Sequence, residues 1–491
     1  MRTITLILFL ILAALPLSAG VTITRAKCQE LYSNLPKDDP WLKNQDGSSL
    51  AWGEAGLIHA ILDFYEATGD TKYLKEVVRR GDRMLSHRDD ARGFKDWSGQ
   101  VHRAWSMALK YTVAEGTLVD SSGKSVIRLR STPYGYNNQT KVEVTSEADA
   151  FCLRITNAYW KREETFADLS ADPASTRYFE RIINDPAPTP NPKPGTEHSQ
   201  LLKAISISKG IPKAQSLVLQ PLSLAYCGYV GIIYYPLLRF AEIVRADAAL
   251  KEFQPAADRF IKAADETYAD YQDHFRNGPG KDEGYYITCK RGGPFPYDDL
   301  PEPFNYLGGH VSSETALYLL TGKPIYKEHV RRMANLFKNR LKLVPGDAYV
   351  WNYWYEPITT GYTRKDDLSD NYPELPPRAA VEDNSHGTLD VWLVMNAADA
   401  GIVFDEKDLR RFANTFLKNL VRPDFSGVNG KVDGSPATGK FIRSGITGWL
   451  PLAAADPAVY EVCRKVYVNQ GTDSFLTLAR LLKWEKKLGT R

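Results

Sequence analysis

Groups suited to proton transfer lie close together in residues 382–390, which read Glu382-Asp383-Asn384-Ser385-His386-Gly387-Thr388-Leu389-Asp390. Histidine suits proton transfer near neutral pH because its free imidazole has a pKa of about 6.5. Asp383, Asn384 or Ser385 is expected to cap a helix that begins near His386. His386 and Asp390 would then be one turn apart, so we expect the Asp390 carboxylate to hold the imidazole in one tautomer. A purely structural histidine is the alternative interpretation.

Aromatic side chains precede this segment. Residues 349–356 read Tyr349-Val350-Trp351-Asn352-Tyr353-Trp354-Tyr355-Glu356, and Arg378 lies between the two segments. An extended conformation would turn alternate residues to one face and present an aromatic wall. Sugar rings pack on aromatic faces, so the chain's 10 Trp, 27 Tyr and 19 Phe favour carbohydrate as a ligand. A buried, aromatic-rich loop is the alternative interpretation.

A third polar segment opens another predicted helix and reads Pro303-Phe304-Asn305-Tyr306-Leu307-Gly308-Gly309-His310. The two glycines allow another backbone to approach closely. His310 and Glu314 have the spacing of metal ligands on a helix. No third ligand is identifiable, so we predict no metal or other cofactor and expect His310 to be a sugar contact or a core residue.

The elements that must position these groups are mainly helices. Apolar residues follow the 3.6-residue helical period in residues 57–64 and in many later segments. A weak repeat supports stacked helical hairpins, since residues 64–69 and 317–322 both end a predicted helix at glycine, the usual left-handed cap. We therefore predict a mainly α fold, an (α/α) toroid or incomplete barrel of helical hairpins, with an open solenoid as the alternative.

The openings of three predicted helices carry the residues of interest. Tyr226, Tyr306 and His386 fall in these openings, and successive openings are about 80 residues apart. A closed ring of hairpins would bring such equivalent positions together around one groove. This is why we favour the toroid over the solenoid.

Two segments depart from the helical pattern. Residues 118–160 contain runs at 124–129 and 141–153 that alternate apolar and polar residues, which predicts a small strand-rich insertion. Residues 185–194 are rich in proline and predict an extended surface loop.

The first residues resemble a secretory signal peptide. A basic start, an apolar run from Ile4 to Leu17 and small residues near Ala19 predict cleavage that leaves residues 20–491 as one catalytic domain in the periplasm or the medium. The run is shorter than the roughly 20 residues that span a bilayer, which disfavours the alternative of a membrane anchor. A net charge of +3 with scattered cations predicts no nucleic-acid partner. The five cysteines are widely spaced, so either one or two disulfides or buried thiols would fit.

With these segments in view, the mature chain resembles the helical-toroid polysaccharide lyases that cleave uronate polymers such as alginate or glucuronan. It is also similar to the helical domain of glucuronyl C5-epimerases. The resemblance rests on Asn384-Ser385-His386, on Trp351-Asn352-Tyr353-Trp354-Tyr355, and on Pro303-Phe304-Asn305-Tyr306 with the later Thr321-Gly322 turn. Alginate lyases of this class often use an Asn, a His and a Tyr. Here Ser385 separates the Asn from the His, and the phenol must come from Tyr306, Tyr353 or Tyr355.

The resemblance implies β-elimination on an acidic polysaccharide. The C5 proton of a uronate is weakly acidic, so Asn384 or a protonated Glu382 would hydrogen-bond the substrate carboxylate, and Arg378 could pair with it. We assign His386 as base, Tyr306 and then Tyr353 as acid, and Asn384 as carboxylate neutraliser, while exchange of the His and Tyr roles stays open. The expected substrate contacts are Arg378, Glu382, Asn305, His310, Trp351, Trp354, Tyr355 and Tyr226.

Three rival functions stay open on the sequence alone. A glycoside hydrolase would need two carboxyl groups, roughly 6.5–9.5 Å apart if the enzyme inverts. The candidates for such a pair are Glu54, Glu314, Glu356, Glu382 and Asp390. A C5-epimerase would share the proton abstraction and leave chain length unchanged. A non-catalytic glycan-binding protein would bind polysaccharide without turnover.

Overall fold

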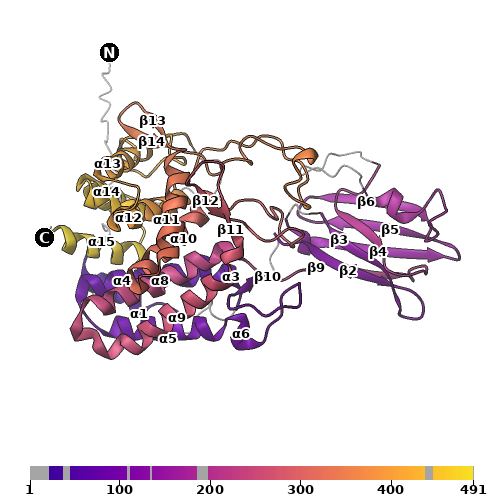
Figure 1. Ribbon diagram of the computed structural model, residues 1–491, viewed down its shortest axis with the longest axis horizontal. Helices are drawn as coiled ribbons and strands as arrows, with labels where there is room; N and C mark the ends of the chain where they lie inside the picture. Colours follow the sequence, from indigo (N-terminus) through magenta and orange to yellow (C-terminus); the bar gives the residue numbers. More distant parts are fainter. Residues whose placement is uncertain are drawn as a thin grey trace, which may run out of the picture.

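The computed structural model describes residues 22–36, 45–107, 111–132, 135–184, 197–436 and 446–489. The predicted signal peptide at 1–19 and the proline-rich loop at 185–194 lie outside these residues. Figure 1 shows a body of helices and, beside it, a separate part built of strands.

The prediction of a mainly α toroid was wrong. Helix accounts for 47% of the chain and strand for 18%, and several antiparallel sheets are present, so the protein is a mixed α and β protein. The strands at 124–129 and 141–153 are confirmed as parts of β3, β4 and β5. The strand-rich region is longer than the expected 118–160, because it runs from β2 to β9 and includes strands that pair across long stretches of sequence.

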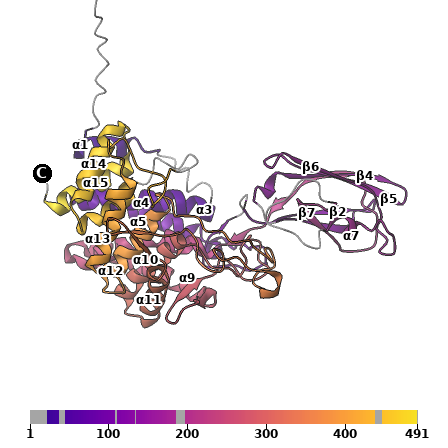
Figure 2. The same cartoon turned by 90° about the horizontal axis from the view of Figure 1, so that it is seen from above.

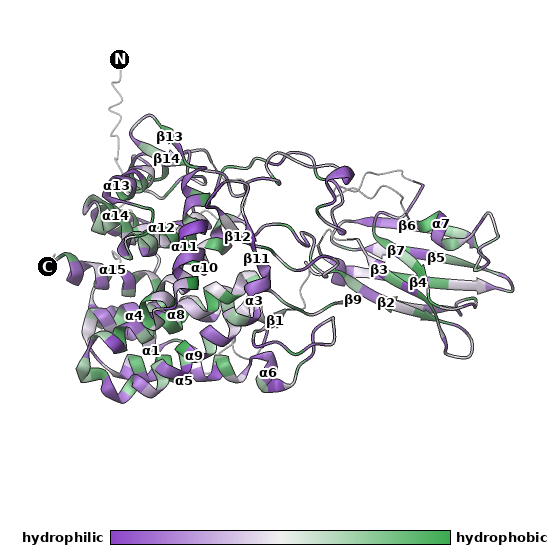
Figure 3. Ribbon diagram, viewed as in Figure 1, coloured by the Kyte–Doolittle hydropathy of each residue, from purple (hydrophilic) through white to green (hydrophobic). Residues whose placement is uncertain are grey.

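The helices of the first part form an inner and an outer set. The inner helices are α4 (Ala55–Thr68), α8 (Cys227–Ala246), α10 (Phe304–Thr321), α12 (Gly387–Asp399) and α15 (Phe475–Leu488). The first four are mainly apolar, whereas α15 buries one apolar face and carries charged residues on the other. The outer helices are α5 (Lys72–Ser86), α9 (Gln254–Asp270), α11 (Pro324–Lys338), α13 (Glu406–Asn414) and α14 (Ala458–Gln470). Along α5 and α9 hydrophobic and hydrophilic residues alternate (Figure 3), as expected for helices that bury one face.

Shorter helical segments complete this body. They are α1 (Arg25–Ser33), α3 (Gly47–Ser49), η1 (Leu50–Glu54), α6 (Asp89–Arg92), η3 (Ala248–Phe253), η4 (Gln272–His274), η5 (Arg364–Asp366), η6 (Thr415–Leu420) and η8 (Ile446–Ala454). The glycine caps predicted after residues 68 and 321 are confirmed, since Gly69 and Gly322 have φ of 78° and 71°.

The inner helices pack at very short range. Helix α8 packs between α4 and α10, and α10 packs between α8 and α12. A Cβ atom on Gly231 of α8 would overlap the backbone of Gly309 in α10, and a Cβ on Gly308 would overlap the Leu389 carbonyl of α12. Glycine is therefore required here by the close approach of two backbones.

The strand part consists of two four-stranded antiparallel sheets, seen as two layers in Figure 2. One has the order β7-β3-β2-β9, the other β6-β5-β4-β8, and apolar side chains from both form its core. The strands are β2 (Ala114–Val119), β3 (Ser125–Ser131), β4 (Thr140–Glu147), β5 (Ala150–Asn157), β6 (Arg162–Leu169), β7 (Leu202–Ser206), β8 (Gln215–Val218) and β9 (Gln220–Pro221). The segments η2 (Asn137–Gln139) and α7 (Phe179–Ile183) belong to the same part.

In the described part of the chain, three short pairs of antiparallel strands lie outside the two four-stranded sheets. They are β1 (Ser106–Met107) with β10 (Leu224–Ala225), β11 (Phe275–Asn277) with β12 (Gly284–Tyr286), and β13 (Lys342–Val344) with β14 (Ala348–Val350). The first pair matters most, because β1 precedes the strand part and β10 follows it. It therefore ties the two ends of the insertion together, immediately before Tyr226.

All five cysteines are free thiols, and four of them are buried. Helix α8 is the one described helix that is long and apolar enough to cross a membrane by length and composition, yet most of it is buried among its neighbours. Its apolar character is that of a core helix.

The glycine contact between α8 and α10 predicts a stability effect of defined sign. Gly231→Ala should lower the midpoint of thermal unfolding, because overpacking a tight core contact costs about 1–3 kcal/mol. Gly56→Ala is the control: Gly56 lies inside α4 with no atom near its missing side chain, so alanine should stabilise the helix by about 0.5–1 kcal/mol. Circular dichroism melts of both variants check this, and a Gly231→Ala protein as stable as wild type would contradict the contact.

Candidate active site

A cavity of about 1010 Å³ opens where the inner helices begin. Tyr226 precedes α8, Tyr306 lies in the first turn of α10, and His386 directly precedes α12. The structure thus brings these three equivalent positions to one cavity, which Tyr353 and Trp354 also line. Its further aromatic lining consists of Trp52, Tyr111, Tyr229, Phe295, Tyr297 and Trp392.

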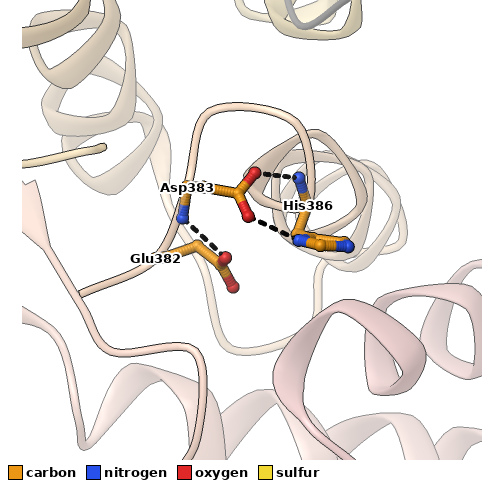
Figure 4. Close-up of side chains that lie close together, drawn as sticks. All are labelled: Glu382, Asp383 and His386. Atoms are coloured by element: carbon orange, nitrogen blue, oxygen red, sulfur yellow. Dashed lines mark hydrogen bonds and ion pairs between the residues drawn. The ribbon is translucent and has the colours of Figure 1, made fainter. Parts of the chain in front are cut away.

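Asp383 holds the His386 imidazole. The Asp383 Oδ2 atom lies 2.6 Å from Nδ1 of His386, and Oδ1 accepts a hydrogen bond from the backbone amide of His386 at 2.9 Å (Figure 4). The same Oδ1 accepts a second hydrogen bond from the Ser385 backbone amide at 2.8 Å. One carboxylate thus satisfies the backbone amides at the start of α12 and orients the ring. The imidazole side chain is 31% exposed and lines the cavity.

The charge state of Asp383 follows from these contacts. Burial acts to raise the pKa of its carboxyl, but the hydrogen bonds from the His386 side chain and from the two amides outweigh burial and lower the pKa below the usual value. An ionised Asp383 favours the His386 tautomer that carries its proton on Nδ1, which leaves the lone pair on Nε2. The arrangement suits a base that accepts a proton at Nε2.

The partner of the imidazole differs from the expected one. Asp390 points into the core, where its Oδ2 accepts a hydrogen bond from the Trp351 indole at 2.7 Å. Burial, and then the neighbouring Asp390, raise the pKa of Glu382 well above its usual value, and burial raises that of Asp390 to about 7. Glu382 and Asp390 therefore form a fully buried carboxyl pair that keeps at least one proton at neutral pH.

The Tyr353 phenol contacts the imidazole, and other phenols line the same cavity. The Tyr353 and His386 rings are 5.3 Å apart between centroids, and Trp52 contacts both His386 and Tyr306, at 6.3 and 5.8 Å. The Tyr226 hydroxyl donates to buried Glu302 at 2.7 Å. Burial raises the pKa of Tyr226, Tyr306 and Tyr353 well above that of free tyrosine. These phenols stay protonated and act as hydrogen-bond or proton donors.

Several predicted site residues lie behind the cavity wall. Asn384 is 2% exposed, and its amide donates to the Asn429 carbonyl at 2.7 Å. The others are also buried and absent from the described lining: Glu382, Asn305, Trp351 and Tyr355. Asn305 is unusual, since neither atom of its buried amide has a hydrogen-bond partner among the described residues.

His310 and Arg378 occupy different settings. His310 is a core residue: its ring stacks on Tyr286 at 4.3 Å, and burial lowers its pKa to about 3. Glu314 hydrogen-bonds with Tyr286 and His329. Arg378 is half-buried. Burial raises the pKa of Tyr297, a residue that lines the cavity, and the charge of Arg378 acts to lower that pKa.

One cluster has the composition of a metal site. Glu382, Asp383 and His386 each offer a ligand atom within 4.8 Å of the others (Figure 4). Both oxygens of Asp383 and the Nδ1 atom of His386 are already used in hydrogen bonds to each other and to the backbone. As arranged, these side chains form a hydrogen-bonded unit that orients the imidazole.

Sequence reasoning assigned no role in the site to Tyr229, Phe295, Tyr297, Trp392 or Asp383. For Asp383 the sequence predicts only that it is one of three candidate caps for the following helix, and Asp383 does bind the backbone amides of Ser385 and His386. Its contact with the imidazole is what sequence reasoning missed. The aromatic residues carry no local signal, since they reach the cavity only through packing. No protein-family model matches the chain, and no curated protein matches it either.

The buried carboxyl pair predicts a pH-dependent stability. An unfolded Asp has a pKa of about 4, whereas Asp390 in the fold has a pKa of about 7. The folded state therefore holds the extra proton between these values, and its stability falls as the pH rises from 5 to 8. Asp390→Asn removes this titration and keeps a hydrogen-bond acceptor for Trp351. Between pH 5 and pH 8 the free energy of unfolding of the variant should therefore fall by about 2 kcal/mol less than that of wild type.

Urea unfolding at the two pH values measures this difference. Asp258→Asn, which removes an exposed carboxylate, is the control and should follow the wild-type pH dependence. Parallel behaviour of Asp390→Asn and wild type would contradict the retained proton.

Proposed function

We propose that this protein is a polysaccharide lyase that cleaves a uronate-containing polysaccharide by β-elimination. One observation carries the proposal: the His386 imidazole, held by Asp383, contacts the Tyr353 ring in a large aromatic cavity. A base and a protonated phenol side by side are the two groups that the elimination needs.

The reaction follows from the charge states of these groups. His386 takes the C5 proton at Nε2, and the electrons of that C–H bond form a double bond between C4 and C5 while the C4–O4 bond breaks. The ionised Asp383 stabilises the imidazolium as it forms. A phenol gives its proton to O4, and proton exchange with solvent restores both groups.

The raised pKa of the phenols favours one of the two role assignments. A tyrosine base would need a lowered pKa, whereas burial raises those of Tyr306 and Tyr353. This supports histidine as base and tyrosine as acid. Tyr353 contacts the imidazole directly and can serve a leaving group on the same face of the sugar as the proton. Tyr306 is connected to the imidazole through Trp52, which contacts both rings, so Tyr306 is the second candidate for the acid.

The substrate carboxylate needs other partners than Asn384, whose amide is buried against Asn429. Arg378, whose charge acts on the lining residue Tyr297, can pair with a carboxylate at the edge of the cavity. Ser385 lines the cavity beside His386, and its hydroxyl can donate to the substrate carboxylate, whereas the Thr388 hydroxyl already donates to the Ser385 carbonyl at 2.8 Å. The Arg378 and Ser385 side chains would stabilise the negative charge that develops on the substrate carboxylate as C5 loses its proton.

The glycoside hydrolase alternative receives less support. None of the described lining residues is an aspartate or glutamate. The candidate carboxylates are engaged elsewhere: Glu54 bonds to Arg80, Glu314 to His329 and Glu356 to Arg340, and Glu382 and Asp390 are fully buried. A hydrolase would need two of them at the sugar.

His386→Ala should lower turnover by about 10³-fold, because general-base catalysis contributes about 10²–10⁴-fold. Ultraviolet absorbance of the unsaturated product, with alginate or glucuronan as substrate, measures this rate. His102→Ala is the matched control, since His102 also pairs with an aspartate, Asp96 at 3.0 Å, and has a similar exposure of 28%.

The control should keep full turnover, and circular dichroism should show both variants folded. Turnover of His386→Ala within about tenfold of wild type would remove the assignment of the base. Saturated products only would indicate a hydrolase, and an unchanged chain length with an altered C5 configuration would indicate an epimerase.

The contact between His386 and Tyr353 also predicts a stereochemical preference. In β-D-mannuronate and β-D-glucuronate the C5 proton and O4 lie on the same face, whereas in α-L-guluronate they lie on opposite faces. We expect faster cleavage of polymannuronate and glucuronan than of polyguluronate, and Tyr353→Phe should lower that cleavage by about 10²-fold. A greater loss on these two polymers with Tyr306→Phe than with Tyr353→Phe would overturn the choice of Tyr353.

A further inference from the structure

The loop between β5 and β6 presents large aromatic rings to solvent. In residues 158–161, Tyr159 is 46% exposed and Trp160 is 39% exposed, and Lys161 follows them. Exposed rings gathered at one place indicate a binding surface, since they gain nothing for the core. The loop belongs to the strand part, outside the helical body (Figure 1).

The loop is fixed by a buried polar residue beneath it. Asn157 is 2% exposed, its amide donates to the Tyr136 carbonyl at 3.0 Å and to the Thr140 hydroxyl at 2.9 Å, and its Oδ1 accepts from the Trp160 amide at 3.1 Å. The Trp160 indole donates to the Gly135 carbonyl at 3.2 Å. The rings are therefore held in place before any ligand arrives, which lowers the entropy cost of binding.

Aromatic contacts connect this loop to the cavity. Tyr159 stacks on Tyr136 with an interplanar angle of 7°, and it meets Trp160 edge-on at 5.1 Å. Tyr136 in turn lies 6.3 Å from Tyr111, whose ring lines the cavity. A continuous row of rings thus leads from the candidate active site to the surface of the strand part.

Cations lie at the far end of this row. Trp160 borders a second hollow, of about 890 Å³, which Lys161, Arg162 and Arg177 also line. A row of aromatic rings followed by cations matches the chemistry of an acidic polysaccharide. Its sugar rings can stack on the aromatic side chains, and its carboxylates can pair with Lys and Arg.

The acids of this hollow are mostly engaged already. Glu163 pairs with Arg154 at 2.8 Å. Glu164 accepts hydrogen bonds from the Ser199 hydroxyl at 2.6 Å and the Gln200 amide at 3.0 Å, and burial raises its pKa. These contacts reduce the repulsion that a polyanion would meet there.

We propose that Tyr159, Trp160 and Lys161 form a remote subsite that holds an acidic polysaccharide chain running out of the cavity past Tyr111. The chemical class of this ligand rests on the proposed function. Because the subsite lies outside the cavity, it favours long polymers over short oligosaccharides as substrates.

Affinity electrophoresis of the full chain in gels that contain alginate tests the subsite. The double variant Tyr159→Ala/Trp160→Ala should bind the polymer about tenfold more weakly than wild type, a change that corresponds to about 1.4 kcal/mol. Its ratio of polymer turnover to trisaccharide turnover should fall by a similar factor. Trp97→Ala is the matched control, because Trp97 is 40% exposed and absent from both described linings.

Each outcome bears on the subsite in a defined way. Unchanged retardation of the folded double variant, an equal loss in Trp97→Ala, or a wild type that neither alginate nor glucuronan retards would overturn it. Equal retardation of wild type by a neutral β-glucan would overturn the acidic ligand class. Retardation that depends on the two rings, persists in His386→Ala and comes without any unsaturated product would support the subsite while the proposed lyase activity fails.

Discussion

The close backbone approach of α8, α10 and α12 is the constraint on which the rest of the structure depends. Without side chains at Gly231, Gly308 and Gly309, the three helices lie near enough for their first turns to share one cavity. The positions that face each other there are Tyr226, Tyr306 and His386. Packing between helix backbones therefore sets the distance between the His386 imidazole and Tyr306, while Tyr353 reaches the imidazole from the segment that follows β14. A wider spacing would separate the imidazole from Tyr306 even if every local contact survived.

This packing also decides which acids serve the site. Inside the helical body a charge is tolerated only when it is paired or protonated. Asp383 stays ionised because the imidazole and two backbone amides bind it, whereas burial leaves Glu382 and Asp390 with a shared proton. Burial also raises the pKa of Glu302 behind Tyr226, to about 8. The cavity thus receives neutral phenols and one oriented imidazole, while the carboxylates act from behind its wall.

The sequence predicted these features unevenly, for physical reasons. The spacing of about 80 residues between helix openings predicted which positions would meet, because a repeated unit places equivalent residues alike. It did not predict that Asp390 turns inward to Trp351 or that the Asn384 amide turns to Asn429, since these orientations depend on tertiary packing. The prediction of the fold class was wrong because strands such as β7 pair with β3 across some 70 residues of sequence. A local alternation of apolar and polar residues does not reveal pairing over such a distance.

The insertion of the strand part has a mechanical basis that links it to the cavity. Its two ends are joined by the β1–β10 pair, where Ser106 pairs with Ala225, and the Tyr271 hydroxyl binds the Ala225 carbonyl at 2.8 Å. The residue after Ala225 is Tyr226, which lines the cavity. The strand part is therefore anchored at the cavity edge, and Tyr111 in its first segment contributes a ring to the same wall. Such an anchor would let the proposed polymer substrate contact both parts without a long flexible linker, whose disorder would weaken binding at the second site.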